Sequence, residues 1–212
     1  MNSKALIAAA AVAALLLPIG SAGEANAANK TAAAGSSFVH LGTAVAPLPP
    51  TTILDTLIKA GGPQDIVIQV ALECSLVTDV YSTTIDDHPE GYTAVGRAEA
   101  HVVVWVLLDG SPVTVGGEDA DGKVTFCDRV HQQEIRDIDE DTGNFTIRQL
   151  QETMSANAFN WVALDLGSGI HTIQVMASIE AANTEGSFAQ GAIEKRTLIV
   201  EPVDFAHGAT IV

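Results

Sequence analysis

The sequence contains few aromatic and few basic residues. Aromatics make up 5% of the chain, with two tryptophans and two tyrosines. Sugar sites generally stack rings on exposed aromatics, and Trp105 lies in an apolar run, so only Trp161, Tyr81 and Tyr92 are left for that role. Lysine and arginine total 10 against 26 acidic residues, a formal net charge of −16. Nucleic acids and anionic membrane surfaces require basic patches, so the composition argues against both as partners.

The sequence also lacks the common catalytic motifs. Neither G-x-S-x-G nor H-E-x-x-H occurs, which argues against a serine hydrolase or a zinc protease that such a motif would identify. The histidines are scattered without metal-ligand spacing: His40, His88, His101, His131, His171 and His207. Paired carboxylates for glycoside hydrolysis stay open, because any acid-rich chain offers such pairs. A hydrolase whose residues are unmarked in the sequence therefore stays one alternative.

The longest uninterrupted alanine- and leucine-rich run, at the N-terminus, is short for a membrane span. Residues 5–17 are apolar and follow Lys4, whereas a spanning helix needs about 20 residues. Ala25-Asn26-Ala27 has the small-x-small form of a signal-peptidase site. Residues 1–27 are therefore predicted to be a signal peptide, with an uncleaved anchor as the alternative. The mature chain is expected to be secreted, or periplasmic in a bacterium with two membranes.

Residues 28–50 are rich in alanine and serine and end with Pro47, Pro49 and Pro50. This composition predicts a flexible N-terminal arm with a stiff polyproline end. Within it, residues 38–41 could form a short docking strand. A mobile strand can add to the sheet edge of a neighbour, so residues 28–50 are a candidate route to self-association.

From residue 51 onward the patterns are those of β-strands. Residues 65–74 alternate between apolar and polar positions, and residues 99–115 combine a long apolar run with an Asp109-Gly110-Ser111 turn. Only residues 149–158 could be helical. About 185 mature residues suit one domain. The sequence therefore predicts an all-β, single-domain antiparallel β-sandwich over residues 51–212, immunoglobulin-like or jelly-roll in topology.

One strand resembles a known pattern. Residues 169–175, Gly-Ile-His-Thr-Ile-Gln-Val, resemble the G-x-H-T-I-x-V strand of immunoglobulin-like modules in secreted proteins. With residues 195–202 and 158–161, the chain resembles uncharacterised secreted bacterial proteins with an immunoglobulin-like β-sandwich. The resemblance covers mainly the C-terminal third. It implies the sandwich fold and no particular activity.

Cys74 and Cys127 are the only cysteines. In an exported chain, a pair of cysteines predicts an intramolecular disulfide, which would stabilise the fold by about 4 kcal/mol in the chain-entropy model. Phe126 directly precedes Cys127, and neighbouring residues of a regular strand point to opposite faces. Both side chains can face the core only if the strand is irregular. The sequence therefore predicts either a β-bulge at Cys127 or a bond at a sheet edge.

The acidic loop over residues 137–144 is the strongest chemical pattern. Asp137, Asp139 and Asp141 alternate before a glycine, and calcium prefers such oxygen ligands. The spacing is not that of an EF-hand, because Thr142 stands at the sixth position and Arg148 at the twelfth. Asp119 and Asp121 in a second acidic turn would add ligands if the two turns met. The alternative is a solvated turn, which requires no cofactor.

Three functions follow, in order of preference. The first is a secreted, non-enzymatic β-sandwich of structural or interaction type, with an unknown protein or glycan partner. The second is a calcium- or carbohydrate-binding extracellular module. The third is an unmarked secreted hydrolase.

Overall fold

The computed structural model describes residues 30–43, 48–83, 92–115, 121–138, 146–203 and 205. The predicted signal peptide, residues 1–27, lies outside the described residues. The chain forms two antiparallel sheets that pack face to face, which confirms the predicted all-β sandwich. Among the residues described, no helix is long and apolar enough to cross a membrane.

Each sheet has five strands. Sheet A is built, in order, from β1 (Thr31–Gly35) and β2 (Val39–Thr43), which both pair with β10 (Phe188–Val203), then β4 (Gln64–Thr83) and β8 (Thr146–Leu166). Sheet B is built from β3 (Thr51–Ala60), β9 (Gly169–Asn183) and β5 (Tyr92–Leu108), and β5 also pairs with β7 (Val124–Ile138) and β6 (Ser111–Pro112).

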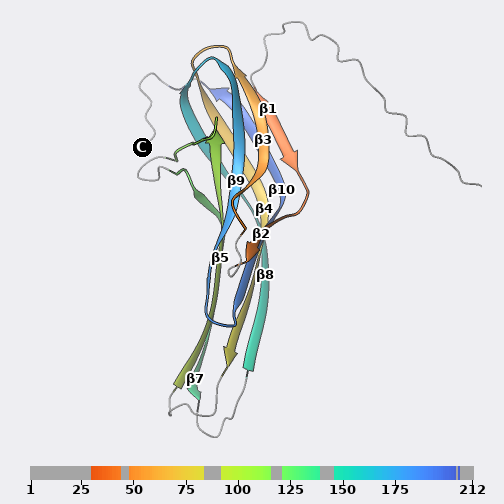
Figure 1. Ribbon diagram of the computed structural model, residues 1–212, viewed down its shortest axis with the longest axis vertical. Helices are drawn as coiled ribbons and strands as arrows, with labels where there is room; N and C mark the ends of the chain where they lie inside the picture. The colour runs from red at the N-terminus through yellow and green to blue at the C-terminus, as the bar shows by residue number, and fades with distance from the viewer. Residues whose placement is uncertain are drawn as a thin grey trace, which may run out of the picture.

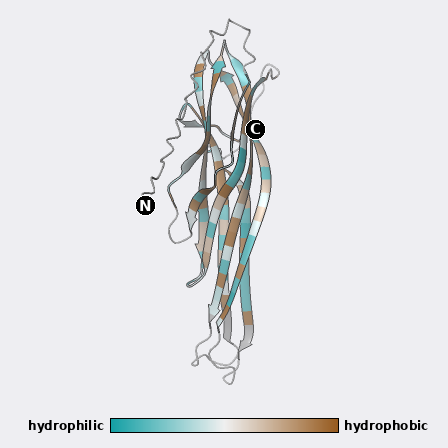
Figure 2. Cartoon of the chain, turned by 90° about the vertical axis from the view of Figure 1, so that its right-hand side faces the viewer, coloured by the Kyte–Doolittle hydropathy of each residue, from teal (hydrophilic) through white to brown (hydrophobic). Residues whose placement is uncertain are grey.

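The molecule is long and narrow (Figure 1). β4 has 20 residues and β8 has 21, so at about 3.3 Å per residue β4 alone spans about 66 Å. The view at right angles keeps the same long outline, with apolar and polar segments alternating along the strands (Figure 2). β9 and β10 turn back partway down, and the other four long strands continue. We call this continuation, residues 78–83, 92–98, 131–138 and 146–151, the lower section.

The core forms between the sheets because alternate residues face inward. On β4 the inward positions Ile66, Ile68, Val70, Leu72 and Cys74 are buried, as the sequence predicts. On β5 the matching buried positions are Ala98, Ala100, Val102, Val104 and Val106. β5 is a central strand, with β9 on one side and β7 on the other, so the expected mid-sheet position of this segment is confirmed.

The two-residue turn after β5 follows directly from its sequence. Asp109 has φ of 50° and Gly110 has φ of 82°, the left-handed backbone that asparagine, aspartate and glycine adopt in hairpin turns. The predicted hairpin is confirmed, although its return strand, β6, has two residues.

The N-terminal boundary differs from the sequence prediction. Residues 31–35 and 39–43 are strands that pair with β10 of the same chain, so the sheet begins at residue 31 rather than at residue 51. Composition could not indicate this, because small residues such as Ala32 and Ala34 have weak strand preference. Residues 31–35 and 39–43 form strands because their backbone groups pair with β10.

The helical reading of residues 149–158 is wrong. These residues lie within β8 and pair one by one with β4, from Gln149 opposite Val80 to Ala158 opposite Ala71. Local helix preference is weak and is overridden by a long partner strand.

The roles expected of the two tryptophans are reversed. Trp161 is fully buried and is therefore unable to stack on a sugar at the surface. Its ring stacks with Phe126 at 6.1 Å and meets Phe159 edge-on at 4.9 Å, and its Nε1 donates to the carbonyl of Gly122 at 2.9 Å. Trp105 is only partly buried, with the Lys123 ammonium 5.6 Å from its ring centroid.

Candidate functional site

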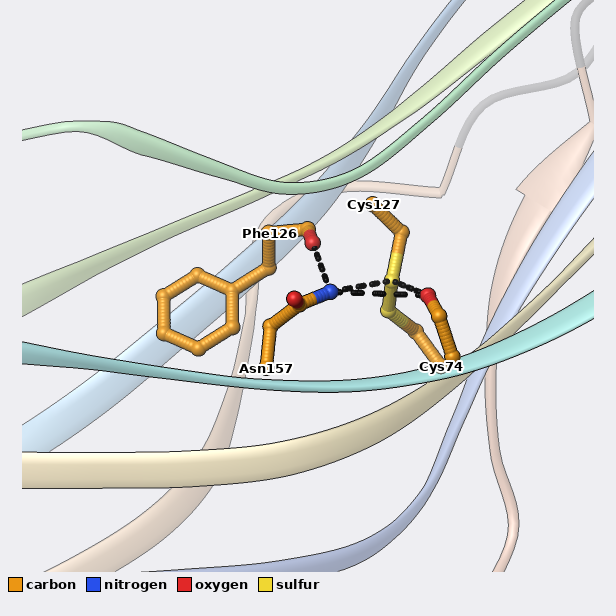
Figure 3. Close-up of a disulfide and its surroundings, with 5 residues drawn as sticks. Cys74, Phe126, Cys127 and Asn157 are labelled. Atoms are coloured by element: carbon orange, nitrogen blue, oxygen red, sulfur yellow. Dashed lines mark hydrogen bonds between the residues drawn. A yellow bond between two sulfur atoms is a disulfide. The ribbon is translucent and has the colours of Figure 1, made fainter.

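The two sheets are joined covalently near the middle of the molecule. Cys74 on β4 and Cys127 on β7 form a disulfide with Cα atoms 6.5 Å apart, as predicted. Both cysteines are buried. The bond therefore ties sheet A to sheet B from within the core (Figure 3).

A β-bulge aims Cys127 at the core. Val102 pairs with Cys127 but Val103 pairs with Thr125, so Phe126 is the extra residue. This confirms the predicted bulge, and because β7 is an edge strand of sheet B the bond also lies at a sheet edge; both Phe126 and Cys127 are buried. The carbonyl of Phe126 accepts a hydrogen bond from Asn157 Nδ2 at 2.5 Å (Figure 3). Asn157 on β8 thus satisfies the backbone group that the bulge removes from the ladder.

In the lower section the interior becomes polar. Thr78, Ser82 and His131 are buried there, and Gln149 Oε1 lies 3.1 Å from His131 Nε2. His131 Nδ1, Ser82 Oγ and the side-chain oxygen of Gln133 have no hydrogen-bond partner among the described residues. Buried polar groups are normally satisfied. This section is therefore held together less by apolar burial than the upper part is.

The layers also come very close in the lower section. A Cβ atom on Gly96 would lie 2.5 Å from Ser82 Oγ and 2.5 Å from a Val80 methyl group. Only glycine fits at this point of close approach. The short spacing leaves little volume between the sheets for a ligand there.

An aspartate–histidine pair links two turns at the upper end of sheet B. His171 Nδ1 lies 2.7 Å from Asp109 Oδ2, and His171 Nε2 lies 2.9 Å from the carbonyl oxygen of Gly167. Both ring nitrogens therefore face acceptors, which only the imidazolium satisfies with two N–H donors. The hydrogen bond that His171 donates to the Asp109 carboxylate raises the pKa of His171. The pKa of Asp109 is lowered, first by His171 and then by the backbone N–H of Thr172.

Arg196 is a buried cation held mainly by backbone oxygens. Only 8% of its surface is exposed. Its Nε donates to the carbonyl of Ile53 on the opposite sheet at 2.7 Å, and its Nη1 donates to the carbonyls of Ser37 and Glu194 at 2.7 and 2.8 Å. These three acceptors lie at irregularities of the ladder: a register shift in β3, the break between β1 and β2, and a register shift in β10. Arg196 therefore joins the two sheets where their own pairing is interrupted.

Of the predicted calcium ligands, Asp121 and Asp137 lie within the described residues, and these two are far apart. Asp121 and Asp137 stand at opposite ends of β7, a strand of 15 residues that spans about 50 Å at 3.3 Å per residue. Asp121 and Asp137 therefore do not ligate one ion within one chain, and the calcium site at residues 137–144 stays a prediction. Asp119, Asp139 and Asp141 lie outside the described residues. No group of three or more metal-ligating side chains occurs within the part of the chain that is described.

A shallow depression of about 450 Å³ lies on the outer face of sheet A. Ala71, Ala156 and Ala158 line it, together with Glu73 and Lys195, whose charged groups pair at 3.1 Å. Alanine side chains carry no acid, base or nucleophile. The depression, which β8 forms in part, therefore combines apolar alanines with one ion pair and the polar side chains of Asn157 and Thr197.

Sequence reasoning missed two of these features. Arg196 follows Lys195 at the start of an apolar run, and a basic pair of this kind reads as a solvated surface. Its burial depends on carbonyls from Ser37 and Ile53, which are distant in sequence. The Asp109–His171 pair could be suspected only from the fact that each residue adjoins a turn.

No family model and no curated protein matches the chain. Among solved structures, weak similarity is found to two structures of infectious bursal disease virus. The VP2 subviral particle is 13% identical with a TM-score of 0.19, covering 82% of this chain and 42% of that chain. The Gx strain structure is 13% identical with a TM-score of 0.17, covering 85% and 46%. The chain spans less than half the length of these neighbours, and a likeness at this level carries no argument about function.

Proposed function

We propose that this chain is an exported, non-enzymatic β-sandwich of structural or interaction type, which acts as a stiff elongated body outside the cytoplasm. The supporting observation is the continuous pairing of β4 with β8 over nearly their whole length. Two layers of such strands bend little, because bending would require many backbone hydrogen bonds to change together.

The disulfide fits an extracellular setting. Cys74 and Cys127 are both buried and bonded across the layers, and structural disulfides persist in oxidising compartments. The predicted leader, residues 1–27, fits the same setting. Secretion, or release into a periplasm, is part of the proposal.

The experiment is native mass spectrometry of the chain produced with its own leader in a bacterial host. The proposal expects a product that begins near Ala28, leaves the cytoplasm and is two mass units lighter than its reduced form. A chain that keeps its leader or stays reduced in the cytoplasm would contradict it. Adding calcium tests the second function: an adduct lost on Asp139→Asn and kept on Asp121→Asn would favour a calcium-binding module instead.

A further inference from the structure

β8 is an open edge of sheet A. Within the described residues it pairs only with β4, along one side. No strand among the described residues pairs with the backbone groups on its other side. An open edge presents unpaired N–H and C=O groups that can accept another strand.

The edge of β8 lacks the usual protection against such pairing. Residues 153–164, Thr-Met-Ser-Ala-Asn-Ala-Phe-Asn-Trp-Val-Ala-Leu, contain no charge, no proline and no glycine. Natural edges are normally blocked by charges, prolines or bulges. Met154 is 52% exposed on the outer face of this segment. The segment therefore combines a free backbone edge with exposed apolar surface.

The other described edges are better protected. β3 carries Asp55 and Lys59 within ten residues, and β7 carries Asp128, Arg129 and Glu134. The remaining edge is made by β1 and β2, which have five residues each with a break between them. β8 is thus the longest edge strand within the described ranges, and its residues 153–164 form an uncharged stretch longer than β1 or β2.

We propose that the occupant of this edge is β8 of a second copy of the chain, in antiparallel pairing centred near Ala158. A two-fold axis normal to the sheet pairs identical strands antiparallel and keeps outer faces on the same side. In this register Met154 lies opposite Val162, and Ala158 lies opposite its own symmetry mate. Asn157 keeps its hydrogen bond to Phe126, because that bond uses the side chain.

The lack of charge on residues 153–164 makes this segment the place where a second copy can approach. Each chain has a formal net charge of −16, so two copies repel one another over most of their surfaces. They can meet closely only through a neutral contact, and residues 153–164 provide one on both copies. A basic partner would find no carboxylate on this segment. The pairing would extend sheet A across two molecules.

The β8–β8 dimer deepens the proposed function of an exported structural module, and its biological meaning rests on that function. The test is sedimentation equilibrium of the mature wild-type chain over a wide concentration range. The wild type should form a dimer whose affinity rises with salt, because salt screens the repulsion between the two acidic chains. A wild-type chain that stays monomeric at every concentration and salt level would overturn the pairing.

Charged variants at Ala158 locate the contact. Ala158 is exposed and lies at the proposed two-fold axis, so Ala158→Lys places like charges directly opposite and should weaken the dimer about tenfold. Ala158→Glu should do the same. An equimolar mixture of the two variants should restore a heterodimer, which a folding defect would not do.

The matched control is Thr197→Lys. Thr197 is exposed and lies in the same row of sheet A, opposite Ala71, but on β10 rather than on the edge. It should dimerise like the wild type. If Ala158→Lys dimerises as well as Thr197→Lys, the β8 contact is wrong. Loss of export without loss of dimerisation would instead contradict the proposed function alone.

Discussion

Arg196 shows how one side chain can replace missing ladder hydrogen bonds. Its guanidinium donates to three carbonyls and to Ser37 Oγ. Gly35 makes room for it, since a Cβ there would lie 2.9 Å from the guanidinium carbon. The planar group with fixed donors suits several acceptors at once, which lysine does not.

Arg196→Met is expected to lower the free energy of unfolding by about 2–4 kcal/mol, because it leaves buried carbonyls without donors. Urea denaturation measures this. Lys195→Met is the control: its side chain is 76% exposed and paired at the surface with Glu73, so its change should stay within about 1 kcal/mol. Equal effects of the two variants would mean that Arg196 is not a structural clamp.

The two tryptophans differ in burial, since Trp161 is fully buried and Trp105 is partly exposed. Trp161→Phe should cost about 2 kcal/mol, because the Gly122 carbonyl loses its donor and the core loses volume. Trp105→Phe should cost less than about 1 kcal/mol, since its ring is partly exposed. Urea denaturation of both variants provides the comparison. The reverse order would mean that the core is wrongly assigned.

At the scale of elements, the Asp109–His171 pair couples the β5–β6 turn to the β8–β9 turn. The raised pKa of His171 gives stability that is present below pH 6.5 and is lost as the pH rises through the folded value. The lowered pKa of Asp109 gives stability that is present above pH 3.8 and is lost as the pH falls through the folded value. The contribution of the pair is therefore largest between these two limits.

His171→Gln should reduce stability by less than about 1 kcal/mol at pH 5, because Asp109 is half exposed and solvent weakens the pair. The difference from the wild type should shrink as the pH rises through the raised pKa of His171, because the imidazole then becomes neutral. Thermal melts over this pH range give the measurement. A difference that grows with pH would contradict the assigned protonation.

The disulfide constrains elements far apart in the chain. Its sequence separation is 53 residues, for which the chain-entropy model gives about 4 kcal/mol. A Cys74→Ala, Cys127→Ala double variant should therefore unfold at lower urea concentration. It should still fold, because the core on β4 and β5 is continuous without the sulfur atoms. An unchanged midpoint would show that the bond constrains little in the unfolded chain.

At the scale of the whole molecule, the strands predict an elongated particle. A compact chain of about 185 residues has a radius of gyration of about 16 Å, whereas a rod as long as β4 has one of about 20 Å. Small-angle X-ray scattering of Ala158→Lys, chosen to avoid the proposed dimer, should give the larger value. A value near 16 Å would exclude the stiff elongated body on which the proposed function depends.

The sequence alone determined the fold class, the central position of β5, the inward face of β4 and the cysteine pair. These depend on alternation between neighbouring residues and on composition, which are local properties. The sequence also predicted either a β-bulge at Cys127 or a bond at a sheet edge, and the structure has a bulge at Phe126.

The tertiary structure decided the features that depend on distant partners. The strand assignment of residues 149–158 requires β4, the strands at residues 31–43 require β10, and the burial of Arg196 requires carbonyls from both sheets. The separation of Asp121 from Asp137 depends on β7 forming one unbroken strand. No local pattern encodes these outcomes, because each depends on which strand lies alongside, and that is settled by packing of the whole chain.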